Sequence, residues 1–349
     1  TETIFGCYKP MALYAFDGTG DAWDQESPIT PTAKTKNDRY LTNVVLFYKE
    51  YVDSGLRAEY FPGVGSSTRI TNRIVGGAFG VGASDVIETA FMQLQEIYES
   101  GDPVIDIVGY SRGAAIARAF ADKIFQDYEK LFNAKGNPLS TPPDIRFLGI
   151  FDTVASFGNP LNDNELIFQE RIPSIVNHTF HAMSLDVKKA GFGLDRAYGD
   201  NVLEVWFRGG HGDVGGNAQL SAGQPNRART NIALNFMLQK ARAAGIQLRE
   251  SNYPMDITAP VVIDGNSDRL DEDTSRRYRN YDIFHYSLFD ETEQEITFPG
   301  CVDLPERHKL VIEEIANESQ LSEQRLLQLT PELSAKYPDT QSIYDKLYE

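Results

Sequence analysis

The sequence predicts an α/β protein with a mostly parallel central sheet, helices on both faces, and a C-terminal irregular and helical extension. Apolar runs alternate with amphipathic helical patterns along residues 11–245, which is the order of βαβ units. The apolar runs are nearly continuous, as expected for strands that helices cover on both sides. With 349 residues, of which 41% are hydrophobic, the chain is long enough for a sizeable core.

Each expected strand is an apolar run that ends at glycine or polar residues. The strands are expected at residues 11–16, 58–65, 104–110, 145–154, 176–185 and 202–210. The expected helices have apolar residues at helical spacing, and they cover residues 41–52, 83–101, 113–129 and 230–245. Ser84 and Thr230 are the expected N-caps of two of these helices, and Gly101 and Gly245 mark their expected ends.

Three regions follow from this pattern. Residues 1–246 are expected to form the core domain. Residues 247–304 are more polar, and we expect an irregular insertion or cap there. Residues 305–349 have amphipathic helical patterns, and we expect them to pack on the core as C-terminal helices.

Charge and composition exclude several classes of partner. A formal net charge of −17 argues against nucleic-acid binding and against electrostatic docking on anionic membranes. Neither a signal peptide nor an apolar run of about 20 residues is visible. We therefore expect a cytoplasmic protein, or one exported by a route that needs no signal peptide. Cys7 and Cys301 could form one disulfide or remain two thiols, and we favour the thiols.

The segment Gly109-Tyr110-Ser111-Arg112-Gly113 fits the motif G-x-S-x-G. An apolar strand ends on its first glycine, and an alanine-rich helix follows its second. In this context the serine lies on a strained turn that exposes its Oγ at the carboxyl end of a sheet. We predict that Ser111 is a nucleophile, although a serine that merely caps the helix would fit the same five residues.

A serine nucleophile needs a histidine base and an acid that orients it. Among the five histidines, His211 follows an expected strand and lies between glycines, so it is the favoured base, and His285 is the second choice. His181 lies within an apolar run and is expected to be a core residue or to line the wall of the site, and His308 is expected to be solvated.

The favoured acid is Asp152, which follows an apolar strand, and Asp186 is the runner-up. Asp213 is expected to hold the loop of His211 by accepting backbone N–H bonds. The proposed acid, base and nucleophile all follow strands, so they are expected at one edge of the sheet.

The loop "AFDGTGDAWD" at residues 15–24 is the expected source of an oxyanion donor. Backbone N–H groups of Gly18 or Thr19 would act together with that of Arg112. A calcium loop formed by Asp17 and its neighbours lacks the closing glutamate of an EF-hand. No cofactor and no catalytic metal are expected.

Eight ordered motifs resemble a known family. They are "FDGTGD", "YFPGVGSS", "GGAFGVG", "IVGYSRGAAIARAFA", "GIFDTVASFG", "HAMSLD", "VWFRGGHGDVGGN" and "NIALNFMLQKARAAGI". Their order resembles domain of unknown function 2235, the α/β-hydrolase domain of the first group of type VI secretion lipase effectors. The resemblance covers about residues 12–246. Family members usually have an aromatic residue after "DGT", whereas this chain has Gly20.

The resemblance implies an α/β-hydrolase-like fold and hydrolysis of acyl esters, in particular those of glycerophospholipids. It places the nucleophile at Ser111, the acid at Asp152 and the base at His211. It also implies transient contact with a membrane surface, and an immunity protein or secretion partner that no residue reveals. Two alternatives stay open: a non-catalytic binding module on the same fold, and an amidase or peptidase that uses the same triad.

Overall fold

The computed structural model of the 349-residue chain describes residues 11–23, 41–65, 82–101, 103–155, 170–187, 193–220, 223–251, 253–256, 259–262 and 283–284. The strands are β1 (Met11–Phe16), β2 (Arg57–Phe61), β3 (Val104–Tyr110), β4 (Ile145–Phe151), β5 (Val176–Ser184), β6 (Val202–Phe207) and β7 (Ile283–Phe284). The α-helices are α1 (Asn43–Asp53), α2 (Ala83–Ser100), α3 (Arg112–Asp127), α4 (His211–Gly215) and α5 (Arg227–Ala243).

The described strands form one seven-stranded sheet in the order β2-β1-β3-β4-β5-β6-β7. Every described pair of neighbouring strands is parallel. All carboxyl ends therefore lie at one edge of the sheet, and the segments that follow β1, β3, β4 and β6 meet there.

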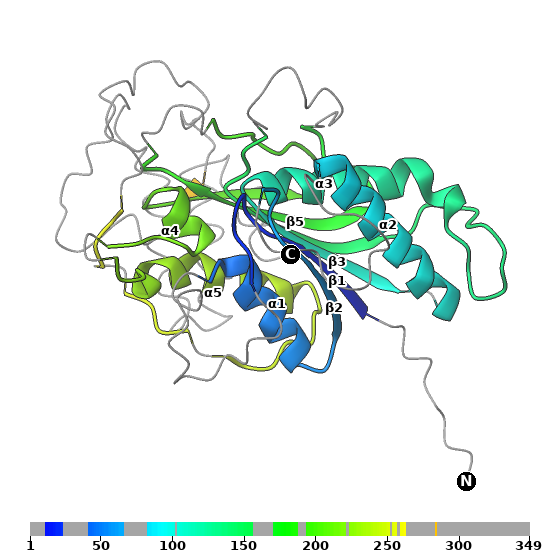
Figure 1. Ribbon diagram of the computed structural model, residues 1–349, viewed down its shortest axis with the longest axis horizontal. Coiled ribbons are helices and arrows are strands. Elements are labelled where there is room, and N and C mark those ends of the chain that lie inside the picture. Colours follow the sequence, from blue (N-terminus) through cyan, green and yellow to red (C-terminus); the bar gives the residue numbers. More distant parts are fainter. Residues whose placement is uncertain are drawn as a thin grey trace, which may run out of the picture.

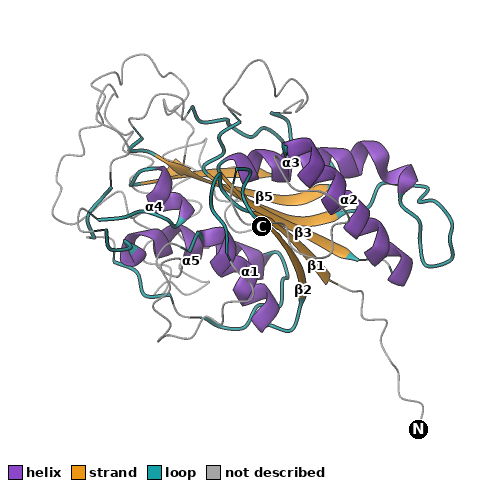
Figure 2. Cartoon of the chain, in the orientation of Figure 1, coloured by secondary structure: helices purple, strands orange, loops and turns teal. Residues whose placement is uncertain are grey.

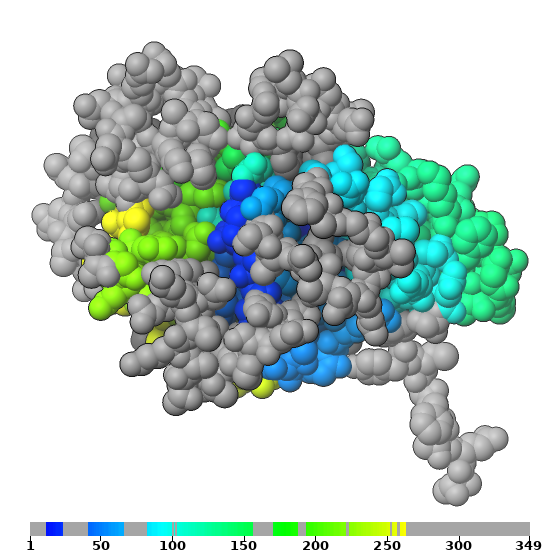
Figure 3. Space-filling model, viewed as in Figure 1, coloured from blue at the N-terminus to red at the C-terminus, as the bar shows by residue number. Residues whose placement is uncertain are grey.

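Helices cover both faces of this sheet, as Figures 1 and 2 show. One buried apolar cluster joins the sheet to α1 and α5, and a second joins its other face to α2 and α3. In the space-filling view, α2 and α3 (cyan to blue-green) form one flank, and α4 and α5 (yellow-green) lie toward the opposite flank (Figure 3). The predicted α/β-hydrolase-like class is confirmed.

Most element boundaries lie close to the predicted ones, but two N-caps are wrong. Helix α2 begins after Gly82, whose N–H donates to the Asp85 carboxylate at 3.1 Å, so Ser84 lies inside the first turn. Helix α5 begins after Asn226, whose carbonyl accepts the N–H of Thr230 at 3.0 Å. In both cases a residue further upstream satisfies the first turn, and the predicted cap is already helical.

The segment after α5 extends the core instead of leaving it. The side chain of Asn231 donates to the Pro254 carbonyl at 2.7 Å, and Arg229 donates to the Ala259 carbonyl. The Val262 carbonyl accepts the N–H of Gly210 at 3.0 Å. Within the expected insertion at residues 247–304, the described residues up to 262 therefore lie along α5 as far as the turn before α4, and Ile283–Phe284 pair with β6.

Several predictions fall on residues outside the described ranges. They are Cys7, Cys301, His285, His308 and the expected helices at residues 305–349. In the part of the chain that the structure describes, no helix is both long and apolar enough to cross a membrane.

Candidate active site

Ser111 lies at the sharp turn between β3 and α3, in a backbone conformation that non-glycine residues rarely adopt. Its φ is 57° and its ψ is −125°. It occupies the N-cap position of α3, but its side chain makes no capping hydrogen bond. The geometry therefore differs from that of an ordinary serine cap, whose extended backbone lets the hydroxyl accept an N–H bond.

The two glycines of the motif make this turn sterically accessible. A Cβ on Gly109 would lie 2.5 Å from the carbonyl oxygen of Gly113, and a Cβ on Gly113 would lie 2.3 Å from that of Asp17. Helix α3 thus passes directly over the end of β1 and over its own preceding strand. The motif spacing reflects this close approach of three backbone segments.

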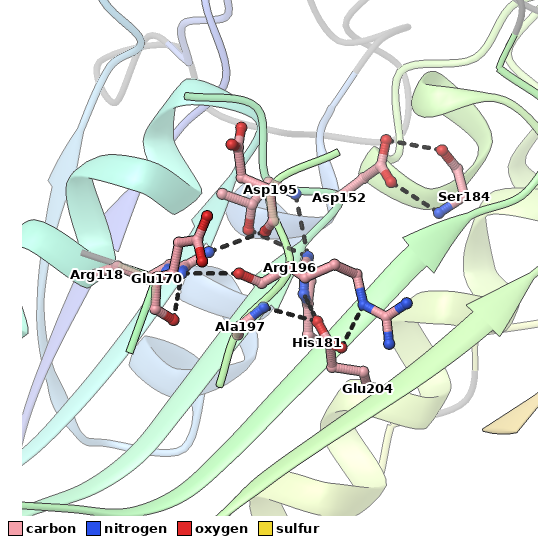
Figure 4. Close-up of polar contacts among 10 residues, drawn as sticks. Arg118, Asp152, Glu170, His181, Ser184, Asp195, Arg196, Ala197 and Glu204 are labelled. Carbon is pink, nitrogen blue, oxygen red and sulfur yellow. Dashed lines mark hydrogen bonds and ion pairs between the residues drawn. The ribbon is translucent and has the colours of Figure 1, made fainter. Parts of the chain in front are cut away.

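Asp152 follows β4, the strand next to β3, and its φ of 41° is also positive. Its N–H donates to the carbonyl of Ala182 at 2.7 Å. The backbone N–H of Ser184 donates to its Oδ1 at 2.8 Å, and the Ser184 hydroxyl donates to its Oδ2 at 2.7 Å (Figure 4). The carboxylate is fully buried and is oriented by bonds to neighbouring strand β5.

His211 is the first residue of α4, in the segment that follows β6. Its Nδ1 lies 2.6 Å from Asp152 Oδ2, and its Nε2 lies 2.8 Å from Ser111 Oγ. Because the carboxylate only accepts, Nδ1 carries a proton and Nε2 faces the hydroxyl as acceptor. The structure thus brings the three favoured residues, scattered over a hundred positions, into one hydrogen-bonded chain.

The turn before His211 is held by a buried carboxylate, as expected for Asp213. Asp213 Oδ2 accepts the N–H of Gly210 at 3.2 Å and that of Val262 at 2.8 Å. Its Oδ1 accepts the Asn226 side chain at 3.0 Å. Burial raises the pKa of Asp213 to about 6, although these hydrogen bonds act in the opposite direction.

The runner-up acid, Asp186, has a different environment. Its Oδ2 accepts Arg208 Nε at 2.9 Å and the N–H of Gly209 at 2.7 Å. These bonds fix the turn after β6. The carboxylate that contacts His211 is that of Asp152 and not that of Asp186.

Three neighbours of the site were not foreseen from the sequence. One is Ser184, which orients Asp152 and could be noticed only as a polar residue at a strand end. The ring of Tyr110 packs against the imidazole of His211, with 4.7 Å between centroids. Its hydroxyl lies 3.3 Å from both the His211 carbonyl and Asn217 Oδ1. Nothing in the spacing of Tyr110 or Asn217 marks these contacts.

The loop after β1 lies directly beside the serine turn. The side chain of Arg112 donates to the Thr19 hydroxyl, which joins the start of α3 to this loop. The N–H of Gly18 donates to Asp17 Oδ1 at 2.8 Å. The loop therefore places the backbone of Gly18 and Thr19 near the N-terminus of α3.

The buried carboxylate of Asp17 and the half-buried carboxylate of Asp21 support this loop. Asp17 accepts the Tyr60 hydroxyl at 2.6 Å, and Asp21 accepts the Asn217 amide at 3.2 Å. Burial raises the pKa of Asp17 to about 6. Burial, followed by the charge of Asp17, raises that of Asp21 to about 7. Within the described residues, no group of three or more His, Cys, Asp or Glu side chains is placed to hold a metal ion.

Comparison with known proteins places the chain in a family. A family model described as type VI secretion system, phospholipase effector Tle1-like, catalytic domain, matches residues 13–126 and 125–240. No curated protein matches the chain.

The solved structures that match parts of the chain share little sequence with it. An uncharacterized protein from Pseudomonas aeruginosa is 22% identical with a TM-score of 0.47, over 72% of this chain and 48% of that one. The Tle1 effector solved in complex with the VgrG spike is 18% identical with a TM-score of 0.36, over 60% of this chain and 51% of that one. A putative α/β hydrolase from Agrobacterium tumefaciens is 12% identical with a TM-score of 0.35, over 70% and 89%.

The chain spans about half the length of the first two of these proteins. The family model nevertheless matches well over half of the chain, and its two matched segments contain the serine turn, Asp152 and His211. The chain belongs to the family of Tle1-like phospholipase effectors of the type VI secretion system, within the catalytic domain that the family model describes.

Proposed function

We propose that the protein is a serine hydrolase that cleaves carboxylic acyl esters, with phospholipids as the substrate class, through an acyl-enzyme. One observation carries the proposal: Ser111, His211 and Asp152 form a buried hydrogen-bonded chain with separations of 2.8 and 2.6 Å. Family membership supports the same reaction, since the matching family model is described as the catalytic domain of Tle1-like phospholipase effectors. The order serine, acid, histidine along the chain is also that of α/β-hydrolases.

In the first step, Ser111 Oγ attacks the ester carbonyl carbon while His211 Nε2 takes the hydroxyl proton. The imidazolium that forms is stabilised by the Asp152 carboxylate at Nδ1. Because Ser184 also donates to this carboxylate, Asp152 keeps one orientation throughout the reaction. His211 then returns the proton to the leaving alcohol.

The tetrahedral intermediate carries a negative oxygen that needs nearby N–H donors. We assign the backbone N–H of Arg112 at the start of α3 as the first donor. Thr19 is favoured over Gly18 as the second, because the N–H of Gly18 already donates to Asp17. Loss of one such donor typically costs about 3–4 kcal/mol of transition-state stabilisation.

In the second step, water attacks the acyl-enzyme with His211 again acting as base, and the fatty acid leaves. A lipid ester requires transient contact with a membrane surface, which for a protein of net charge −17 depends on apolar contacts. Family membership supports delivery by a type VI secretion system. No cofactor takes part in the proposed steps.

A fluorophosphonate probe, which labels activated serines, tests this proposal. We expect the folded protein to be labelled and the Ser111→Ala variant to remain unlabelled. A phospholipid panel and short-chain p-nitrophenyl esters should be hydrolysed by the wild type alone. Equal labelling of both proteins, or turnover by Ser111→Ala, would contradict the proposal, and faster cleavage of matched amides would make the protein an amidase.

A further inference from the structure

A second buried polar cluster lies behind Asp152, on the sheet face opposite α5. Its centre is His181 of β5, which pairs in register with Glu204 of β6. The neighbouring residues Phe180 and Ala182 belong to the apolar cluster of α1 and α5. Alternation along the strand therefore turns His181 to the other face, where it is fully buried.

The two ring nitrogens of His181 have different partners. Nε2 accepts the backbone N–H of Thr153 at 3.2 Å and lies 3.1 Å from the Thr153 hydroxyl. Nδ1 lies 2.9 Å from Glu204 Oε1 (Figure 4). Nε2 therefore carries no proton, and Nδ1 donates to the carboxylate. Burial lowers the pKa of His181, which agrees with this neutral tautomer.

Glu204 is fixed in turn by the segment that covers this half of the sheet. The N–H of Ala197 donates to its Oε1 at 2.8 Å, and Arg196 Nε donates to its Oε2. Burial would raise the pKa of Glu204, but the hydrogen bonds from His181 and Ala197 and the charge of Arg196 outweigh burial and lower it. The glutamate is therefore ionised and holds the imidazole in one orientation.

The same segment reaches both the serine helix and the turn after Asp152. Arg118 of α3 donates to the carbonyls of Asp195 at 2.9 Å and of Arg196 at 3.0 Å. The N–H of Asp195 donates to the carbonyl of Thr153 at 3.0 Å. Thr153 is thus held through its N–H by His181 and through its carbonyl by Asp195.

Thr153 matters because it directly follows the strained residue Asp152, whose φ is 41°. A residue in this conformation keeps it only where the surroundings fix the chain on both sides. Strand β5 fixes the N–H of Asp152 through Ala182 at 2.7 Å. The bond from Thr153 to His181 fixes the following peptide.

We propose that His181 is a positioning residue for the proposed acid: by accepting the Thr153 N–H while Glu204 holds its Nδ1–H, it keeps the Asp152 carboxylate aimed at His211. The inference rests on the proposed hydrolase function. His181 does not touch the reacting atoms, and it acts only through the peptide between Asp152 and Thr153.

Two substitutions separate the two hydrogen bonds of the imidazole. His181→Gln places an amide oxygen near the position of Nε2, so the Thr153 N–H keeps an acceptor. His181→Asn places an amide N–H near Nδ1, so the bond to Glu204 survives and the Thr153 N–H loses its acceptor. His181→Gln loses the bond to Glu204, whereas His181→Asn loses the contacts of Nε2 with the Thr153 N–H and hydroxyl. A purely structural role therefore predicts that the loss of turnover in each variant follows its loss of Tm.

With a p-nitrophenyl ester, we expect kcat of His181→Asn to fall at least about tenfold with KM within twofold, because misplaced catalytic groups slow the chemical step. His181→Gln should keep kcat within about threefold of wild type. Tyr51→Phe is the matched control, since it removes the buried hydrogen bond from Tyr51 to Asp106 (2.7 Å) on β3. It should lower Tm without changing kcat.

Equal kcat in the Asn and Gln variants, or a loss in Tyr51→Phe that matches its loss of Tm, would overturn the inference. If His181→Asn fails to fold, nitrogen-15 NMR of the histidine-labelled wild type decides: a neutral Nδ1–H tautomer supports the inference, and a proton on Nε2 refutes it. Failure of the proposed function has a different signature, because wild type and Ser111→Ala would then behave alike toward the fluorophosphonate probe.

Discussion

Replacing Gly113 by alanine is expected to damage both stability and activity, because the turn leaves no room for a methyl group. A Cβ at this position lies 2.3 Å from the carbonyl oxygen of Asp17 and 2.4 Å from that of Phe16. Both obstacles are backbone atoms at the end of β1, so no side-chain rotation relieves the overlap. To restore ordinary contact distances, β1 and α3 must separate by about 1 Å.

Two measurable effects follow from this separation. Overpacking of a dense interior lowers the free energy of unfolding by about 1–3 kcal/mol. Because the atoms that a methyl group at Gly113 would meet belong to the backbone, we expect a loss of about 3 kcal/mol for Gly113→Ala. The displaced strand end also leads directly into Thr19, the favoured second oxyanion donor. Because a displacement of about 1 Å can cost about 100-fold in rate, we expect kcat/KM to fall by about that factor.

Gly55→Ala is a suitable control for this prediction. Gly55 has a φ of +80°, but a Cβ there meets nothing within 4 Å. The substitution should therefore cost only the backbone strain, about 1–2 kcal/mol, and leave kcat/KM unchanged. Urea unfolding and ester hydrolysis, normalised to folded protein, measure both quantities. Wild-type stability and turnover in Gly113→Ala, or an equal loss of turnover in Gly55→Ala, would refute the reasoning.

Three further predictions concern carboxylates in and beside the site. Asp152→Asn should lower kcat by about 10⁴-fold with little change in folding, because an amide does not hold His211 in the required tautomer. Steady-state kinetics measures the loss, and circular dichroism checks the fold. Retained turnover would contradict the prediction. Asp21→Asn should flatten the pH dependence of the free energy of unfolding. The pKa of Asp21 is about 7 in the folded protein, above its ordinary value of 3.8, so the folded wild type binds the proton more tightly than the unfolded chain. Wild type therefore loses stability as the pH rises from about 4 to 7, by at most about 4 kcal/mol. Urea unfolding from pH 4 to 8 measures this, and parallel curves for wild type and variant would refute it. Asp213→Ala should lower the free energy of unfolding by about 2–3 kcal/mol, because it leaves buried donors unpaired, and an unchanged urea midpoint would contradict this.

The order and type of most described elements could be predicted because their signals are local, whereas the short helix α4 and the two-residue strand β7 were not predicted. Apolar runs bounded by glycine indicate strands, and the turn Gly109–Gly113 lies between a strand and a helix in sequence and in structure alike. Helix starts were less predictable. Asn226 begins α5 because its side chain bonds to Asp213 at 3.0 Å and to Pro260 at 2.7 Å. Those partners come from other parts of the chain, so no local pattern reveals them.

The difference between local sequence signals and contacts with distant parts of the chain also decides how much of the candidate site could be predicted. Ser111, Asp152 and His211 each follow a strand, and a parallel sheet brings such positions to one edge. This rule predicts a shared edge without the strand order, but the contacts among the three residues also depend on β3, β4 and β6 lying close together in the sheet. The contact between His181 and Glu204 requires the strand order as well, because it depends on β5 and β6 being neighbours in one particular register. From the sequence alone, His181 was interpreted as a core or wall residue, with no role toward Asp152.

The strain at the site is shared between its two neighbouring turns. Among the described residues, Ser111 and Asp152 are the non-glycine positions with positive φ, and such conformations cost about 1–3 kcal/mol each. Ser111 N–H donates to the Phe151 carbonyl at 3.0 Å, and the Ser111 carbonyl accepts the Val154 N–H at 3.3 Å. Both bonds join Ser111 to residues on either side of Asp152, so relaxation of either turn would break bonds that the two turns share. Because the turns depend on each other, the hydroxyl and the carboxylate keep fixed positions on either side of His211, which itself needs no strained backbone at the start of α4.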